Sequence, residues 1–447
     1  MIYQNIVEAI GNTPILKIDP KVHGLKNIEL YAKLEYMNPF GSVKDRTAKA
    51  ILYEALDDAI KNNKKIIEFS SSNTAKALAV LCSINGLRYK TYSNRIKVSE
   101  LRMILQILGS EIEEFRGVSD CPDFNDPLNP VDTLTDLMKK YPTEYYHTDQ
   151  YFNKNNPNIH HDTTGKEIYD DLGEIDYFAG FLGTVGTTVG VGTYLREKNP
   201  KTQIIGIAAE EYNHVPGGRS INELAEVGFY KKDFYNEILV GTTQQAIDGL
   251  LELNRKCGML CGPTSGLTYF ALVNRLKVID QSVNPSKKMK CVFIACDRME
   301  TYTSYLKKHR PELFAKSTTT YPKVNDLTDN EVEQAKSISP ENLWVKLATK
   351  RENLMLIDTR GNFAFKVGHI EGSVNILDQL FSECIEQGNI FPKDKILILI
   401  CGVGNVSKRH AVFLQKQGYD AMSLEGGIMN WKNKELPLVK QGEVNHE

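Results

Sequence analysis

Short apolar runs alternate with helical patterns from Leu30 to about Thr303. The clearest runs are residues 65–69, 175–181, 204–208 and 291–295. Buried parallel strands that alternate with helices form an α/β sheet. Because ligands of such sheets bind beyond the carboxyl ends of the strands, the loops after these runs are where we expect the chemistry.

The remaining length predicts a second domain. The chain has 447 residues, which is long for one hydrophobic core. Residues 307–337 are polar and lack a sustained period, as in a linker. Beyond them, apolar segments at 354–360, 368–375 and 396–401 indicate strands and turns of one small α/β domain. We expect domains at 1–306 and 338–441, joined by 307–337.

Composition excludes several classes of function. The chain has 54 basic and 56 acidic residues, a net charge of −2, and therefore no electrostatic footprint for nucleic acid or an anionic membrane. It lacks a transmembrane stretch and an N-terminal signal region. Its eight cysteines are scattered, and neither Cys257 with Cys261 nor the adjacent His160 and His161 has metal-ligand spacing. We expect a soluble, cytoplasmic protein without a metal.

One lysine stands where a turn meets an amphipathic helix, in Asn-Pro-Phe-Gly-Ser-Val-Lys-Asp-Arg-Thr at 38–47. Asn-Pro and Phe-Gly mark the turn, and the hydroxyl of Ser42 can cap the helix. Partial desolvation at this helix start would lower the pKa of Lys44, which a Schiff-base lysine requires. Spacing alone leaves open a solvated surface lysine.

Two loops after predicted strands have the chemistry of anion sites. Ser70-Ser-Ser-Asn-Thr74 offers small polar side chains and free N–H groups at a helix start, although an extended helix cap would look the same. Gly183-Thr-Val-Gly-Thr-Thr188 lets N–H groups and hydroxyls approach a phosphate. A dinucleotide fingerprint is the competing interpretation, but its third glycine is missing.

These stretches resemble the cysteine synthase and cystathionine beta-synthase family of fold type II pyridoxal-phosphate enzymes. Residues 38–47 resemble the family's cofactor-lysine motif, and Ile-Gly-Asn-Thr-Pro-Ile-Leu at 10–16 resembles its opening segment. Further matches extend to about residue 306. The resemblance implies two α/β subdomains, bound pyridoxal 5'-phosphate, a homodimer, and Lys44 as the Schiff-base lysine and α-proton base.

The resemblance also assigns ligand-binding roles. Asn73 should face the 3-hydroxyl group of the cofactor. The substrate carboxylate should meet Ser70, Ser71, Thr74 and Gln150. The cofactor phosphate should meet Gly183, Thr184, Gly186 and Thr187. Glycines of the family are replaced here by Ser72, Ala75 and Val185. Thr264 should meet the pyridine nitrogen, and because a neutral hydroxyl does not protonate the ring, elimination at the β carbon is favoured.

A cysteine ends the most apolar strand of the C-terminal region. Cys401 precedes a loop of five residues, and a helix is expected from Ser407. Loop N–H groups and a helix N-terminus would lower the pKa of the thiol and hold an anionic persulfide, whereas an inert buried cysteine is the alternative. Together with Asp358-Thr-Arg360, Gly368-His-Ile370 and residues 425–431, the loop resembles a rhodanese domain. Val406 replaces the arginine that many active rhodaneses carry, which disfavours thiosulfate as sulfur donor.

These observations predict a lyase or transferase of sulfur metabolism. The expected reaction is pyridoxal-phosphate-dependent β-replacement or β-elimination on a serine- or cysteine-type amino acid, with sulfide or a thiol as partner, as in cysteine synthase, cystathionine beta-synthase or cysteine desulfhydrase. Cys401 would collect or deliver persulfide sulfur. Two alternatives stay open. One is β-replacement by an amine to form a diamino acid, and the other is a catalytically weakened regulatory protein.

Overall fold

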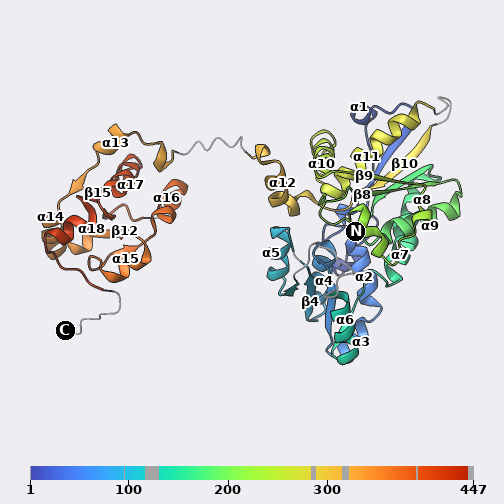
Figure 1. Cartoon of the computed structure of the whole chain (residues 1–447), viewed down its shortest axis with the longest axis horizontal. Coiled ribbons are helices and arrows are strands. Elements are labelled where there is room, and N and C mark those ends of the chain that lie inside the picture. The colour runs from blue at the N-terminus through green and yellow to red at the C-terminus, as the bar shows by residue number, and fades with distance from the viewer. Residues whose placement is uncertain are drawn as a thin grey trace. The chain divides into compact units, whose positions relative to one another are not determined.

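The computed structural model describes residues 2–94, 96–115, 130–282, 288–314, 322–388 and 391–440. It divides into two compact units, residues 1–315 and 316–447 (Figure 1). The division falls inside 307–337, the segment expected to be the linker.

The first unit contains a six-stranded sheet that is parallel except at one edge. Its strands, in spatial order, are β1 (Ile15–Lys17), β2 (Ile28–Lys33), β10 (Met289–Ile294), β7 (Tyr177–Phe181), β8 (Gln203–Ala209) and β9 (Glu237–Gly241). Only β1 pairs antiparallel with its neighbour among these strands. Three of the four apolar runs read from the sequence form the central strands β7, β8 and β10.

The fourth apolar run lies in a second, smaller sheet of the same unit. This sheet is wholly parallel, with the order β5 (Glu111–Glu114), β4 (Tyr89–Ser93), β3 (Lys65–Phe69) and β6 (Tyr145–His147). The expected α/β class with two subdomains is confirmed, because each sheet is built from strands joined through helices.

Helices cover both sheets. The α-helices are α1 (Pro20–His23), α2 (Lys44–Tyr53), α3 (Leu56–Lys61), α4 (Asn73–Ile84), α5 (Ser99–Ile107), α6 (Pro130–Lys140), α7 (Asn155–Ile159), α8 (Lys166–Leu172), α9 (Gly186–Lys198), α10 (Thr243–Cys257), α11 (Pro263–Asp280) and α12 (Thr303–His309). A π-helical segment, η3 (His160–Gly165), joins α7 to α8. Short 3-10 helices are η1 (Ile6–Ala9), η2 (Glu35–Met37), η4 (Ile221–Glu226), η5 (Lys232–Phe234), η6 (Met299–Tyr302) and η7 (Pro311–Leu313).

Strand periodicity distributes the core over both faces of the large sheet. Successive strand residues point to opposite faces. Phe178 and Val292 accordingly belong to one buried cluster, and their neighbours Ala179 and Phe293 belong to another. The first cluster also contains Phe69 of β3, so the same apolar core joins the two sheets. The loops that follow β3, β7 and β10 therefore meet across this core.

The second unit is one parallel sheet with helices. Its strand order is β11 (Ser337–Ile338), β15 (Ala421–Leu424), β14 (Ile396–Ile400), β12 (Leu354–Asp358) and β13 (Val374–Asn375). Its helices are η8 (Val324–Asp326), α13 (Asp329–Glu333), α14 (Pro340–Thr349), η9 (Arg351–Asn353), α15 (Asn362–Val367), α16 (Asp378–Gln387), α17 (Asn405–Lys416) and α18 (Gly427–Asn433). Val324 is buried in this core, so packing on the unit begins ahead of residue 338.

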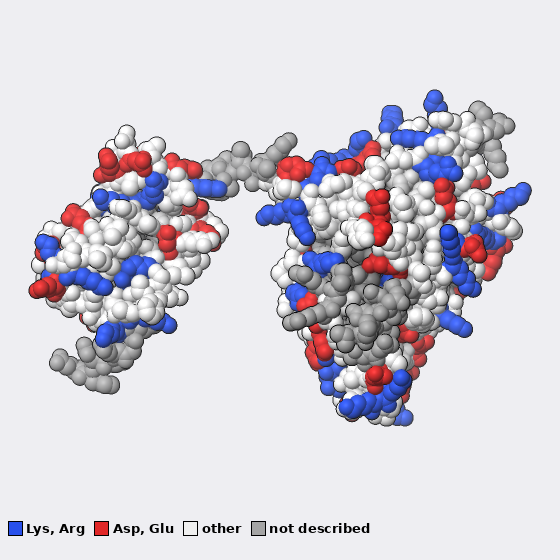
Figure 2. Space-filling view, viewed as in Figure 1, with Lys and Arg blue, Asp and Glu red and all other residues white. Residues whose placement is uncertain are grey.

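The distribution of charged side chains on the surface is consistent with the nearly equal numbers of acidic and basic residues. On the face seen in Figure 2, acidic and basic side chains are intermixed over each unit. In the described part of the chain, no helix is long and apolar enough to cross a membrane. The seven described cysteines are free thiols, and Cys121 lies outside the described residues.

Candidate active site

A cavity of about 490 Å³, including its open mouth, lies where the loops after β3, β7 and β10 meet the start of α2. Five of the residues predicted from the sequence line it, namely Lys44, Asn73, Gly183, Thr187 and Thr264. Cys296 and Asp297, which the sequence reasoning did not place in the site, line it as well.

Lys44 is the first residue of α2 and reaches solvent only in part. Its backbone N–H donates to the Ser42 hydroxyl at 3.2 Å, so Ser42 satisfies one free N–H of the first turn, while the N-cap residue itself is Val43. Desolvation by the surrounding protein lowers the pKa of the Lys44 amine, while the neighbouring Cys296 and Asp297 act against that shift. Lys44 is therefore not the solvated surface lysine of the alternative interpretation.

Asn73, the first residue of α4, is held by residues that lie near the C-terminal end of the first unit in the sequence. Its Nδ2 donates to Asp297 Oδ2 at 2.7 Å and to the Tyr302 hydroxyl at 3.1 Å. Its Oδ1 is buried and has no hydrogen-bond partner among the described residues. Buried acceptors are rarely left unpaired in native proteins. A ligand hydroxyl in the cavity would satisfy this one.

The loop between β7 and α9 has the shape of an anion cradle. Gly186 opens α9, and a Cβ at this position would lie 2.2 Å from Asn156 Oδ1, so only glycine fits. Val185 adopts the left-handed conformation, with φ of 55°. A β-branched residue is strained in that region, by about 1–3 kcal/mol. The loop thus keeps the backbone path that a glycine would allow, and the first N–H groups of α9 would be available to an anion.

The loop predicted to hold a carboxylate lies beside the cavity. Thr74 Oγ1 donates to Gln150 Oε1 at 2.8 Å, so these two predicted residues do meet. The Ser70 hydroxyl accepts the Ala75 N–H at 3.1 Å and is used within the loop, and Ser71 is partly exposed. Of the loop residues only Ser72 and Asn73 line the cavity described above.

The two glycine replacements in that loop are accommodated without strain. Ser72 has a φ of −143°, and Ala75 lies inside α4. Neither residue has a positive φ, so a Cβ is tolerated at both positions.

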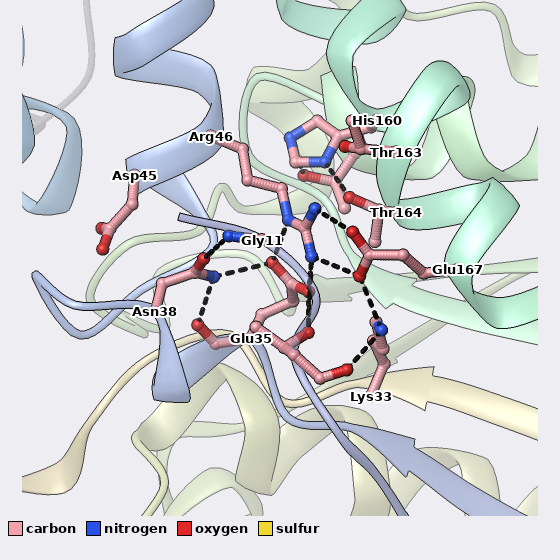
Figure 3. A network of polar contacts seen from close by, with 12 residues as sticks. Gly11, Lys33, Glu35, Asn38, Asp45, Arg46, His160, Thr163, Thr164 and Glu167 are labelled. Carbon is pink, nitrogen blue, oxygen red and sulfur yellow. Dashed lines mark hydrogen bonds and ion pairs between the residues drawn. The ribbon is translucent and has the colours of Figure 1, made fainter. Parts of the chain in front are cut away.

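A buried charge network fixes the helix that begins at Lys44 (Figure 3). The Arg46 guanidinium bonds Glu35 through Nε at 2.8 Å and Glu167 through Nη1 at 2.6 Å. Lys33 Nζ lies 2.8 Å from Glu167, which balances the two carboxylates with two cations. Burial alone would raise the pKa of Glu35, but the Arg46 charge and hydrogen bonds lower it. The network ties α2 to the end of β2 and to α8.

Cys401 lies at the corresponding edge of the second unit, directly after β14. Its buried Sγ accepts the Gly404 N–H at 3.1 Å and lies 3.2 Å from the Ser407 hydroxyl. The helix begins at Asn405, two residues before the expected start. Arg409 bonds the Leu327 carbonyl at 2.9 Å and Asp329 at 3.0 Å, so its guanidinium is engaged away from the thiol.

Comparison with known proteins agrees with this geometry. The family model for "Pyridoxal-phosphate dependent enzyme" matches residues 6–297, and that for "Rhodanese-like domain" matches residues 339–434. Cysteine synthase B of Pseudomonas aeruginosa is 30% identical over 307 residues, which cover 68% of this chain and 96% of that protein. Cystathionine beta-synthase of Apis mellifera is 32% identical over 319 residues, covering 67% of this chain and 60% of that protein.

Solved structures give the same result. A hydrogen sulfide-producing enzyme from Fusobacterium nucleatum is similar with a TM-score of 0.58 and 26% identity, over 67% of this chain and all of that one. A cysteine synthase from Entamoeba histolytica is similar with a TM-score of 0.57 and 28% identity, over 68% of this chain and 90% of that one. Each similarity spans about two thirds of this chain.

The fold and the lysine-containing cavity define a fold type II enzyme that uses pyridoxal 5'-phosphate. The chain belongs to the family of pyridoxal-phosphate dependent enzymes, with relatives among the cysteine synthases and cystathionine beta-synthases, and carries a C-terminal rhodanese-like domain. The predicted family and cofactor are thereby confirmed.

Proposed function

We propose that the first unit catalyses β-replacement or β-elimination on a serine- or cysteine-type amino acid, with sulfide or a thiol as the sulfur partner. The observation that carries this proposal is one cavity that combines the desolvated amine of Lys44, the hydroxyl of Thr264 and the unpaired Oδ1 of Asn73. The sulfur chemistry is supported by the names of the relatives, which are cysteine synthases and cystathionine beta-synthases.

The residues present fit the cofactor. The cradle formed by Gly183, Thr184, Gly186 and Thr187 would hold its phosphate, Asn73 would meet its hydroxyl, and Lys44 would hold it covalently. Bound pyridoxal phosphate supplies an electron sink for the charge that develops at the α carbon when its proton leaves. The hydroxyl of Thr264 would leave the pyridine nitrogen unprotonated, which favours loss of the β substituent.

Lys44 is assigned the proton transfer. An amine accepts a proton only when it is neutral, and desolvation lowers the pKa of Lys44 below its ordinary value, which enlarges the neutral fraction. Ser70, Ser71, Thr74 and Gln150 are assigned to the substrate carboxylate. Of these, Thr74 and Gln150 are already joined by a hydrogen bond beside the cavity.

We further propose that Cys401 carries persulfide sulfur for the first unit. Its thiolate would take the outer sulfur of a small-molecule persulfide, whose thiol leaves, and a second thiol would then release that sulfur as sulfide and form a disulfide with Cys401. The donors around Sγ, from Gly404 and Ser407, would stabilise an anionic persulfide. A Cys401→Ser variant should change the distribution of sulfur among sulfide, persulfide and cysteine. An unchanged distribution would remove the proposed coupling.

We also propose that the enzyme is cytoplasmic, which its free thiols support, and that it is a homodimer, as its family suggests. Light scattering would test the oligomeric state.

The test is a visible absorbance scan of the purified chain with pyridoxal phosphate, repeated after cysteine and, separately, after O-acetylserine. A Schiff-base band should appear in the unmodified chain and be missing from Lys44→Ala. A shift with O-acetylserine identifies a synthase, and a shift with cysteine together with sulfide release identifies a lyase. Trapping with an amine instead of sulfide would point to diamino acid formation. No band in the unmodified chain would leave the regulatory-protein alternative.

A further inference from the structure

Two fully buried side chains connect the proposed sites for the lysine, the phosphate and the carboxylate. Asn156 of α7 donates through Nδ2 to Thr184 Oγ1 at 3.0 Å and to the Gln150 carbonyl at 2.7 Å. His160 of η3 lies with Nε2 3.1 Å from Thr47 Oγ1 and 3.2 Å from Thr187 Oγ1. Thr47 is one turn beyond Lys44 on α2. Neither Asn156 nor His160 was singled out as functional by the sequence.

The donor and acceptor roles in this cluster follow from one backbone carbonyl. The Gln150 carbonyl can only accept, so the nitrogen of Asn156 must face it and Oδ1 must face Thr47. Asn156 Nδ2 then donates to Thr184 as well. Because the Thr184 oxygen accepts this bond, its own O–H remains available to a ligand in the cradle.

The same reasoning fixes the proton on His160. Thr47 Oγ1 donates to Asn156 Oδ1 at 3.2 Å, so toward His160 it can only accept. His160 Nε2 therefore carries the ring proton, and Nδ1 accepts from the Thr164 hydroxyl at 2.9 Å (Figure 3). Burial, assisted by Arg46 and Lys44, lowers the pKa of His160 well below its ordinary value, so the ring is neutral. The single Nε2–H is shared between Thr47 and Thr187, so neither hydroxyl can donate to this ring nitrogen, and the Thr187 proton remains available to a ligand.

We propose that Asn156 and His160 are positioning residues that make Thr184 and Thr187 hydrogen-bond donors toward the cofactor phosphate. A phosphate oxygen accepts hydrogen bonds, so a threonine that had to donate elsewhere would present a repelling lone pair instead. Thr47 links this arrangement to the helix that carries Lys44. The inference rests on the proposed phosphate site.

Three variants test the proposal, with pyridoxal phosphate titrated into the apoprotein. Asn156→Asp keeps the side-chain shape but replaces the donating nitrogen by an accepting oxygen, which draws the Thr184 proton away from the cradle. His160→Leu removes the donor to Thr187, whereas His160→Gln restores an N–H near the Nε2 position. Each loss of a bond to a charged phosphate should raise the dissociation constant about tenfold or more, and His160→Gln should recover most of it.

Neighbouring residues provide matched controls. Asn155 bonds Glu54 on the surface, and His161 points outward to Asp162 and Glu197. Asn155→Asp and His161→Leu should bind pyridoxal phosphate as tightly as the unmodified chain. The phosphorus-31 resonance of the bound phosphate provides a second measurement, which should move in Asn156→Asp and His160→Leu but not in the controls.

The outcomes separate two failures. If the unmodified chain does not bind pyridoxal phosphate, the proposed function itself is wrong. If it binds, and Asn156→Asp and His160→Leu bind equally well with an unmoved phosphorus resonance, the positioning role is wrong. Should Asn156→Asp fail to fold, as judged by circular dichroism, recovery of binding in His160→Gln relative to His160→Leu decides the question, and equal weakness of both would overturn the proposal.

Discussion

Asn73 Nδ2 donates a hydrogen bond of 2.7 Å to Asp297 Oδ2. The bond joins the start of α4, which follows β3 of the smaller sheet, to the loop after β10 of the larger sheet. Both side chains line the cavity, and the Asp297 charge also bears on Lys44. The Asp297 carboxylate therefore orients the Asn73 amide, which is predicted to bind a cofactor hydroxyl. It also acts to raise the pKa of Lys44, the predicted catalytic amine.

Asp297→Asn should lower the pKa of Lys44 further. The Asp297 charge favours the protonated amine, and its removal leaves desolvation less opposed. In the apoprotein, the pH at which Lys44 reacts half-maximally with an acetylating reagent, followed by mass spectrometry, should therefore move down. Asp162→Asn, an exposed acid elsewhere, should leave that pH unchanged. An upward shift in Asp297→Asn would contradict the assignment.

Val185 should show an inverted preference between alanine and glycine. In ordinary helix positions glycine is about 1 kcal/mol less stable than alanine. At Val185, with φ of 55°, glycine also relieves left-handed strain, so Val185→Gly should be at least as stable as Val185→Ala. Both variants should be less stable than the unmodified chain, because Val185 is buried.

Urea unfolding of the matched pair at Val191 provides the control for this prediction. Val191 is buried within α9 at an ordinary helical position, so Val191→Gly should be the less stable of its pair. The same order at both positions would mean that Val185 is not strained.

Arg46→Met should strongly destabilise the first unit. The substitution leaves the fully buried Glu35 carboxylate without the cation that bonds it directly, a loss that typically costs about 3–5 kcal/mol. Arg310→Met breaks an ion pair with the half-exposed Asp248 and should cost less than about 1 kcal/mol. Denaturant titration of the two variants compares these costs, and near-equal losses would show that the Arg46 network contributes little.

Asp45 should make stability fall as pH rises. Burial raises the pKa of Asp45 from 3.8 to about 7, so the native state keeps a proton that the unfolded chain has released in that window. The free energy of unfolding therefore decreases between about pH 4 and 7. Asp45→Asn should remove this component, at most about 4 kcal/mol, because one pKa unit corresponds to about 1.4 kcal/mol. An identical pH dependence in both proteins would count against it.

Cys296 should be a slow but accessible thiol in the cavity. Burial raises its pKa to about 12, so the thiolate is scarce at neutral pH. Alkylation by iodoacetamide, measured on the Cys296 peptide, should accelerate about tenfold for each pH unit between 7 and 9, since the thiolate is the nucleophile. Bound pyridoxal phosphate should slow it at every pH. Rapid labelling at pH 7, or labelling indifferent to the cofactor, would place Cys296 elsewhere.

The sequence was sufficient for four strands of the first unit and for part of the cavity lining. The apolar runs predicted β3, β7, β8 and β10, because burial on both faces requires continuous apolar residues in a parallel strand. Turn and cap residues around Ser42 predicted where the helix with Lys44 begins, since capping depends on neighbours only a few residues away. The resemblance to known motifs then named Asn73, Thr187 and Thr264, which do meet in one cavity.

Only the tertiary structure decided which distant residues complete the site. Asn73 and Asp297 are separated by 224 positions in the sequence, and Arg46 and Glu167 by 121. No local sequence pattern can therefore predict either contact. In the sequence, His160 and His161 are adjacent and nothing distinguishes them. In the structure, packing buries His160 against Thr47 and Thr187, whereas His161 points outward to Glu197. Spacing along the chain determines the elements, whereas hydrogen bonds and charge pairs inside the core depend on how two sheets pack together.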